Sequence, residues 1–197
     1  KQKVFNFDRY LLAIKNVLSA SGTLSLDTEI LKPVAMQSNF SSPDATAAYQ
    51  LLIQPLVIGS ALDSLEVNGT FSGQVALKEE GLTALKLQLQ KLDLKDEAGR
   101  FSVDNLNADL DWSGDERVKS SALNWQSAQL YEMRLGEMES QFESSNDQLR
   151  LVSAVIMPML GGHLNLRELH VGGVFAGSVG GHLSASLVDL QLPALTR

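Results

Sequence analysis

The chain has 197 residues, a formal net charge of −7 and no cysteine. This length allows one large β domain or two small ones. The acidic balance and the lack of basic clusters argue against nucleic acid and anionic membrane surfaces as partners. The absence of cysteine excludes disulfides and thiol chemistry. No stretch approaches the ~18 apolar residues of a membrane-spanning helix, since the longest candidate, residues 155–160, is interrupted by Pro158.

The N-terminal residues predict the only helix. After a short strand at residues 3–7, Asp8 fits the N-cap position of a helix, and Gly22 is placed to end it. Apolar residues would share one helical face. We therefore predict a short N-terminal helix near residues 8–20. The residues of its apolar face are Leu11, Ile14, Val17 and Leu18.

The next residues follow a period of two, which is typical of strands. The alternation includes Leu24 and Leu26, continues beyond Pro33, and ends at a loop rich in turn residues at 39–44. Residues 45–59 admit two interpretations. Their alanines favour a helix, whereas the apolar residues alternating from Tyr49 onwards favour a strand, and we prefer the strand.

Residues 65–77 show the most regular alternation in the chain. Two of their inward positions are Gly69 and Gly73, which predicts a bend or a close approach of a neighbour there. A polar turn at residues 78–81 then leads into the next strand.

Residues 87–112 predict a bulged hairpin. In each arm two apolar residues alternate with polar ones, one extra residue follows, and two more apolar residues alternate. The extra residue would turn the second pair to the other face unless a β-bulge absorbed it. Residues 96–100 supply the turn. The apolar positions are Leu87, Leu89, Leu92 and Leu94 in the first arm, and Phe101, Val103, Leu106 and Ala108 in the second.

The same pattern recurs after a polar turn at residues 113–117. Its spacings are too irregular for a propeller or a regular solenoid. Gly-Gly-His-Leu stands just before two of the copies, at residues 161–164 and 180–183. The copies are Met133, Leu135, Met138, Ser140 and Phe142; Leu164, Leu166, Leu169 and Val171; and Ala185, Leu187, Leu190 and Leu192.

Catalytic and metal-binding signatures are weak. Ser178 lies in a glycine-rich turn that only superficially resembles a nucleophile elbow, because Ala176 replaces the first glycine. His163 and His182 could meet on adjacent strands, but no acidic residue recurs beside them or His170 at fixed spacing. We therefore expect a protein without enzymatic activity, cofactor or metal.

The abundant feature is the apolar face of the predicted sheet. It is rich in Leu, Val and Met and has little predicted helix to cover it, so it must be covered by another sheet, by its own curling or by a ligand. An ordinary sandwich core and a lipid-facing groove both remain open. The residues of the candidate lipid-contacting face are Leu85, Leu87, Leu89, Leu92, Leu94, Phe101, Val103, Leu106, Leu164, Leu166, Leu169, Leu187 and Leu190.

Residues 133–166 resemble the repeat of the AsmA-like bacterial envelope proteins, in which a large apolar residue, Gly-Gly, any residue and Leu lead into the next strand. In this chain these are residues 160–164. Residues 19–26 are similar to the entry segment of the same repeats, and residues 184–196 resemble YdbH-like members of the family. The second step departs from the pattern, because Val179 precedes it. The resemblance implies a periplasmic protein, tethered to the inner membrane by an anchor outside this chain, whose curved sheet shields phospholipid acyl chains between the two membranes.

We therefore expect a mainly β fold: an extended, twisted and curved antiparallel sheet with bulged strands, forming a groove or a partly open sandwich, with the helix near residues 8–20. Residues 1–197 should form a single β-rich domain with a candidate sub-boundary near 113–118. Since the chain begins at Lys1 without Met or a signal peptide, we expect it to be a piece of a longer protein. Pairing of exposed edge strands with a β-rich envelope partner is the alternative function.

Overall fold

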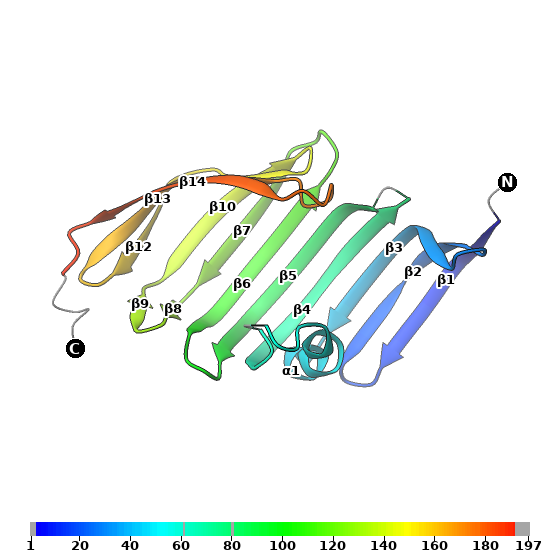
Figure 1. Cartoon of the computed structure of the whole chain (residues 1–197), viewed down its shortest axis with the longest axis horizontal. Helices are drawn as coiled ribbons and strands as arrows, with labels where there is room; N and C mark the ends of the chain where they lie inside the picture. The colour runs from blue at the N-terminus through cyan, green and yellow to red at the C-terminus, as the bar shows by residue number, and fades with distance from the viewer. Residues whose placement is uncertain (1–2, 61, 80, 192–197) are drawn as a thin grey trace.

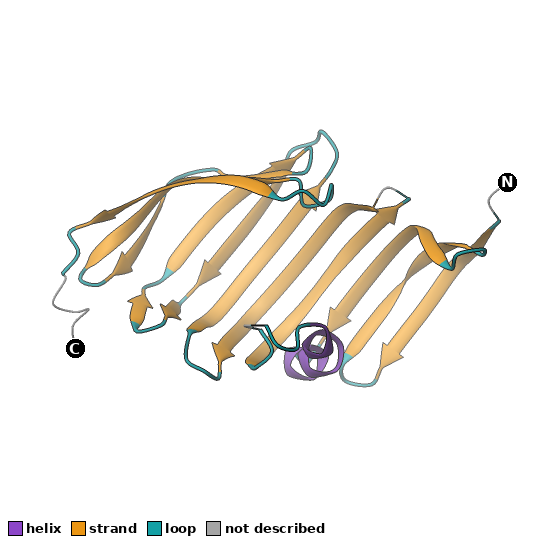
Figure 2. Cartoon of the chain, viewed as in Figure 1, coloured by secondary structure: helices purple, strands orange, loops and turns teal. Residues whose placement is uncertain are grey.

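The computed structural model describes residues 3–60, 62–79 and 81–191. Within them the strands form one antiparallel sheet of 14 strands, which confirms the predicted fold class. Figures 1 and 2 show a long curved sheet with a single helical segment lying against it. The strands are β1 (Val4–Ile14), β2 (Leu18–Asp27), β3 (Lys32–Ser42), β4 (Leu65–Lys78), β5 (Gly81–Asp96), β6 (Phe101–Ser113), β7 (Lys119–Trp125), β8 (Ser127–Leu130), β9 (Met133–Leu135), β10 (Met138–Ser145), β11 (Gln148–Leu151), β12 (Val155–Met159), β13 (Gly162–Gly172) and β14 (Gly180–Val188).

The sheet is a meander. We call each of its rows a ribbon, which is either one strand or two short strands in line, and each ribbon pairs with the next one along the chain. The first six strands pair in sequence order. Beyond them three ribbons are broken in the middle: β7 and β8 both pair with β6, β10 and β9 pair with β7 and β8, and β11 and β12 both pair with β13. Apart from residues 43–64, which join β3 to β4 and include the helical segment, the connections between successive strands are short. The two edges of the sheet are β1 and β14.

Bulges and strand breaks form a crease across the middle of the sheet. From β4 to β13 they occur at neighbouring positions of successive ribbons, whereas the irregularities of β1–β3 lie elsewhere. Such irregularities bend a strand and increase its twist. The crease consists of Gly69 in β4, Lys91 in β5, Asn105 in β6, Gln126 between β7 and β8, residues 136–137 between β9 and β10, residues 152–154 between β11 and β12, and Arg167 in β13.

The predicted bulges in β5 and β6 are confirmed. Lys91 and Asn105 are the extra residues, with φ of 50° and 51°. The Lys91 N–H donates to Asn107 Oδ1 at 2.9 Å, and the Asn105 N–H donates to Asp93 Oδ1 at 2.8 Å. Polar side chains thus supply hydrogen-bond partners to the backbone N–H groups of the bulges, which lowers the free-energy cost of the kinks.

The later copies of the pattern also meet irregularities. In β13 the register shifts between Leu166 and Glu168. The copy that starts at Met133 spans the break between β9 and β10. The last copy leaves regular structure after β14, where Asp189 has φ of 54°, and its final residue, Leu192, lies outside the described residues.

The predicted N-terminal helix is wrong. Residues 8–20 belong to the β1–β2 hairpin, which turns at residues 15–17 with Asn16 at φ 61°. Of the residues that would share a helical face, Leu11 pairs with Ser21 and Ile14 with Leu18 across the hairpin, and Val17 lies in its turn. These cross-strand contacts outweigh the local helical spacing.

The preferred strand at residues 45–59 is also wrong, because this segment is helical. It comprises α1 (Ala45–Ala48), a π-helical turn (Tyr49–Ile53) and a 3-10 turn (Gln54–Leu56). Asp44 caps α1, since its Oδ1 accepts from the Ala47 N–H at 3.1 Å. The small alanines let the helix approach the sheet, where Ala45 and Ala48 are buried.

The two inward glycines of β4 allow the close approach that their positions predicted. A Cβ on Gly69, which has φ of 118°, would lie 2.6 Å from the Lys91 carbonyl oxygen. A Cβ on Gly73 would lie 2.3 Å from the Lys86 oxygen and 2.6 Å from the ring of Phe40. Neither position has room for a side chain.

A buried ion pair fixes the β5–β6 turn. Asp96 is fully buried, and its two carboxylate oxygens accept from Arg100 at 2.6 and 2.8 Å. The Arg100 side chain, followed by the backbone N–H of the same residue, lowers the pKa of Asp96 from 3.8 to about 2, against the opposing effect of burial. The Arg100 pKa is raised in turn by the same carboxylate.

This pair makes a pH-dependent contribution to stability. Because the Asp96 pKa falls on folding, the contribution is complete above the unfolded value of 3.8 and is lost as the pH falls towards about 2. Asp96→Asn should lower the urea midpoint at pH 7 and flatten its decline between pH 4 and 2. Glu66→Gln is the control, because its partner Lys95 lies 3.8 Å away, both side chains are more than half exposed, and such pairs contribute little. Equal pH profiles for the wild type and Asp96→Asn would contradict the assignment.

Candidate functional site

One face of the sheet is apolar across its whole width. The register places apolar residues of neighbouring strands opposite one another, which is the arrangement that stabilises a buried sheet face. Such pairs run from the first hairpin to the last. Examples are Phe7 with Leu24, Met36 with Leu77, Leu87 with Leu110, Phe142 with Leu151, Leu149 with Val171, and Leu164 with Leu187.

The opposite face is polar. Along β5 the residues between the leucines are Lys86, Gln88 and Gln90, and all are exposed. Lys86 Nζ lies 3.0 Å from the carboxylate of Asp111 on β6. Since surface pairs of this kind contribute little energy, the polarity mainly determines which face of the sheet turns to solvent.

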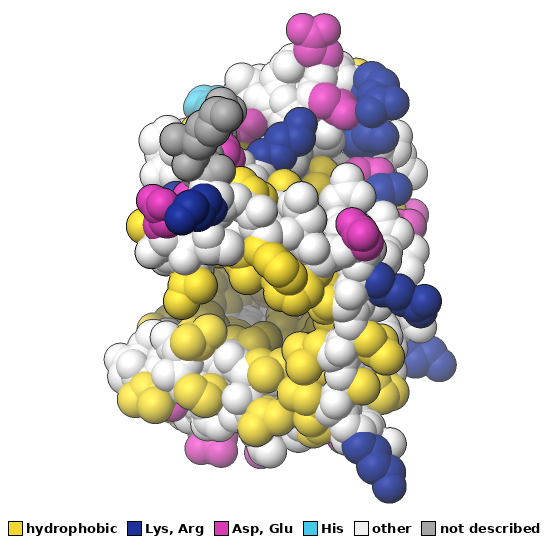
Figure 3. Space-filling model, turned by 90° about the vertical axis from the view of Figure 1, so that its right-hand side faces the viewer, with side chains coloured by type: hydrophobic (Ala, Val, Ile, Leu, Met, Phe, Trp, Pro, Cys, Tyr) yellow, Lys and Arg dark blue, Asp and Glu magenta, His cyan; other side chains and the backbone are white. Residues whose placement is uncertain are grey.

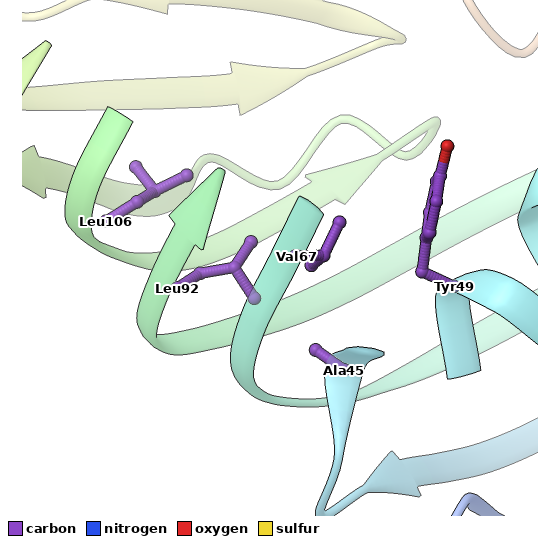
Figure 4. Packing of buried hydrophobic residues seen from close by; sticks show 5 residues of the cluster. All are labelled: Ala45, Tyr49, Val67, Leu92 and Leu106. Atoms are coloured by element: carbon purple, nitrogen blue, oxygen red, sulfur yellow. The ribbon is translucent and has the colours of Figure 1, made fainter. Parts of the chain in front are cut away.

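The helical segment covers the apolar face at one place. Ala45 and Tyr49 pack with Val67, Leu92 and Leu106, and all five are at most 9 % exposed. Figure 4 shows these side chains arising from the helical segment and from three adjacent strands. Val67, Leu92 and Leu106 stand one or two residues from the crease residues Gly69, Lys91 and Asn105. Thr46 Oγ1 also donates to the Val67 carbonyl at 2.5 Å. The segment is therefore fixed on β4, β5 and β6.

Elsewhere the apolar face lines an open hollow. Figure 3, which looks along the sheet from its β1 end, shows hydrophobic side chains around a cavity that opens to one side. The curved sheet is therefore a groove whose long axis crosses the strands, and its lining is only partly covered.

The predicted face residues divide into three groups. Leu92 and Leu106 are buried in the cluster beneath the helical segment, so they belong to the core. Leu187 is 57 % exposed, and Leu190 follows the end of β14. The remainder are partly buried along the groove: Leu85, Leu87, Leu89, Leu94, Phe101, Val103, Leu164, Leu166 and Leu169.

Sequence reasoning missed the contribution of the first hairpin to this face. Phe5 and Phe7 pair with Leu26 and Leu24, and their rings meet edge to face with centroids 4.8 Å apart. The alternation of Val4, Phe5, Asn6 and Phe7 was a signal for a strand, but the predicted helix hid its continuation.

The connection between β13 and β14 folds back onto the rim of the groove. Asp147 fixes it: its carboxylate accepts from the N–H groups of Phe175 and Ala176 at 2.9 and 3.2 Å, and from Trp112 Nε1 at 3.1 Å. The Phe175 and Trp112 rings lie 6.0 Å apart. The tip of the last hairpin thus touches β6, several ribbons away (Figure 1).

The histidines do not assemble with acids into a metal site among the described residues. His170 faces His182 across β13 and β14, whereas His163 faces Val188. His182 Nε2 lies 3.6 Å from a Glu168 carboxylate, with both side chains about two-thirds exposed. Ser178 lies in the β13–β14 turn, where its backbone N–H donates to the Gly173 carbonyl at 3.0 Å. It therefore serves the turn.

None of the helices among the described residues has the length and apolar character needed to cross a membrane. Comparisons of the chain with protein-family models, with curated proteins and with solved structures find no match.

Proposed function

We propose that the protein is a non-enzymatic periplasmic β-groove that shields phospholipid acyl chains and contributes to lipid transport between the inner and outer membranes. The observation that carries the proposal is the apolar face that spans every ribbon of the sheet while the helical segment covers only part of it. Apolar surface of this extent needs an apolar occupant, since exposure to water costs roughly 25 cal/mol per Å². The AsmA-like pattern of the sequence supports the compartment and the lipid.

The lining suits acyl chains better than a compact polar substrate. Described ion pairs lie on the polar face or in turns, as for Lys86–Asp111, Asp96–Arg100 and Glu143–Arg150. A groove rich in leucine offers no fixed set of hydrogen-bond donors to orient a polar ligand. Long flexible chains gain from continuous apolar contact, whatever their headgroups.

The protein purified under native conditions should carry phospholipid, detected by native mass spectrometry and by extraction. Leu87→Asn and Leu166→Asn, on strands at separate places in the groove, should each lower the bound lipid about tenfold, because each places an unpaired amide against the chain. Gln88→Asn on the polar face of β5 is the matched control and should leave bound lipid unchanged. Thermal unfolding of each variant identifies those that lose lipid by losing the fold.

Absence of bound lipid in the wild type, together with failure to take up added phospholipid from detergent, would refute the proposal. Equal loss in Gln88→Asn would also refute it, since this residue does not face the groove.

A second candidate function is pairing with a β-rich envelope partner. The edge strand β1 has one neighbour, β2. Val4, Phe5, Leu11 and Leu12 on it are 42–72 % exposed, and an exposed apolar edge is a template for strand addition. Leu11→Lys should abolish such pairing, as measured by crosslinking to envelope proteins. The amount of bound lipid should stay unchanged.

A further inference from the structure

The segment between β3 and β4 carries a group of exposed apolar side chains that the groove does not use. Residues 45–62 form the longest stretch of the sequence without Asp, Glu, Lys, Arg or His. Its first turn, with Ala45, Ala48 and Tyr49, is buried against the sheet. The rest turns outward. We call the outward group the apolar lobe: Leu51, Ile53, Leu56, Ile58 and Leu62, which are 45–83 % exposed.

Polar groups of the segment that carries the lobe pair with one another and with Asp63, which follows the segment. The Tyr49 hydroxyl donates to the Leu62 carbonyl, and Gln54 Nε2 donates to the Asp63 carbonyl at 2.9 Å. The Gly59 N–H donates to Asp63 Oδ2 at 3.0 Å. Backbone bonds close the successive turns as well. A surface with satisfied backbone groups can leave water at low cost, which is what contact with lipid requires.

The lobe has a definite place beside the groove. Thr46 and Tyr49 hold its base on β4 and on the buried cluster, and Figure 1 shows the helical segment in front of one end of the central strands. The side chains of the lobe are exposed, so they are not packed against the strands that the segment covers.

We propose that the apolar lobe docks the protein on the surface of a lipid bilayer by inserting Leu51, Ile53, Leu56, Ile58 and Leu62 among the headgroups. This inference rests on the proposed function, because docking at this edge would place the groove beside the lipids that it binds. Because residues 45–62 carry no charged side chain, they can enter the boundary between headgroups and acyl chains without burying a charge. The net charge of −7 disfavours anionic surfaces, so apolar insertion into zwitterionic lipid is the expected mode. A second copy of the chain fits less well, since stable protein interfaces use roughly 20–30 residues a side.

Flotation with phosphatidylcholine vesicles tests the docking. The wild-type protein should float with the vesicles at both 0.1 and ~1 M salt, because apolar insertion is not screened. The double substitution Leu56→Asn and Ile58→Asn should lower the partition coefficient about 100-fold, or about tenfold for each side chain withdrawn from the interface. Because both residues are 73–83 % exposed, the melting temperature should stay unchanged.

A matched control comes from the β2–β3 turn. Ile30 and Leu31 are 67 and 77 % exposed, so Ile30→Asn with Leu31→Asn removes similar apolar surface from another place and should leave flotation intact. Equal loss in this control, loss of binding at high salt, or a lobe-dependent dimer in analytical ultracentrifugation would overturn the proposal. Docking and groove binding are separable: Leu87→Asn should lose bound lipid and still float, whereas the lobe variant should keep its lipid and fail to float.

Discussion

Replacing Leu92 by alanine is expected to lower the free energy of unfolding by about 2–5 kcal/mol. Leu92 is 7 % exposed and lies at the centre of the cluster that joins the helical segment to β4, β5 and β6. Removing its methyl groups leaves a void beside Val67, Leu106 and Tyr49. Val67 and Tyr49 also take part in the hydrogen bonds that hold the segment, which limits how far they can move into the void. Urea unfolding at neutral pH measures the change.

The control is the same substitution at Leu187 on β14. This residue belongs to the predicted face but is 57 % exposed, so Leu187→Ala should cost less than about 1 kcal/mol. Equal costs at the two positions would show that the apolar face is uniformly packed. A closed core of that kind would leave no room for a ligand and would count against the groove.

This contrast shows how far the sequence could divide core from surface. The pattern around Leu92 and Leu106 is the same as the pattern around Leu164 and Leu169, because both consist of leucines alternating with polar residues. What makes the first pair core is the helical segment that covers it, which comes from residues 45–56. That contact joins residues distant in the chain, and no local pattern encodes it.

Local patterns sufficed where the constraint itself was local. The bulges at Lys91 and Asn105 follow from one surplus residue between apolar positions, since a bulge can absorb it with the least disturbance of the sheet. The supporting Asn107 and Asp93 side chains lie within the same hairpin. The alignment of seven such kinks into one crease was not predictable, because it depends on the register between strands.

The helical segment itself was misjudged because two signals conflicted. Residues 49–58 alternate well enough for a strand, yet Asp44 caps the first turn and the alanines fit closely against the sheet. The apolar residues left over after that packing are the lobe. The alternation predicted a strand with one buried face. In the structure the first turn of the helical segment is buried against the sheet, and the later apolar side chains are exposed.

Gly22→Ala is expected to be as damaging as a core substitution, although it adds only one methyl group. The sequence suggested that Gly22 ends a helix, but it lies in the middle of β2, opposite Tyr10 and Ser38. A Cβ there would lie 1.8 Å from the Gln37 carbonyl oxygen and 2.9 Å from Ser38 Cα. These are backbone atoms that can move only if β2 and β3 separate, so we expect a loss of about 3 kcal/mol or more in urea unfolding.

Gly180→Ala provides the comparison, since a Cβ at this position in β14 meets nothing within 4 Å. It should change stability by less than about 0.5 kcal/mol, or increase it slightly by restricting the unfolded chain. An unchanged midpoint for Gly22→Ala would mean that β2 and β3 do not pair in the register described. Because β1 and β2 reach the rest of the sheet only through β3, the first two strands would then have to line the groove in another arrangement, and the phenylalanines of β1 would no longer continue its apolar face.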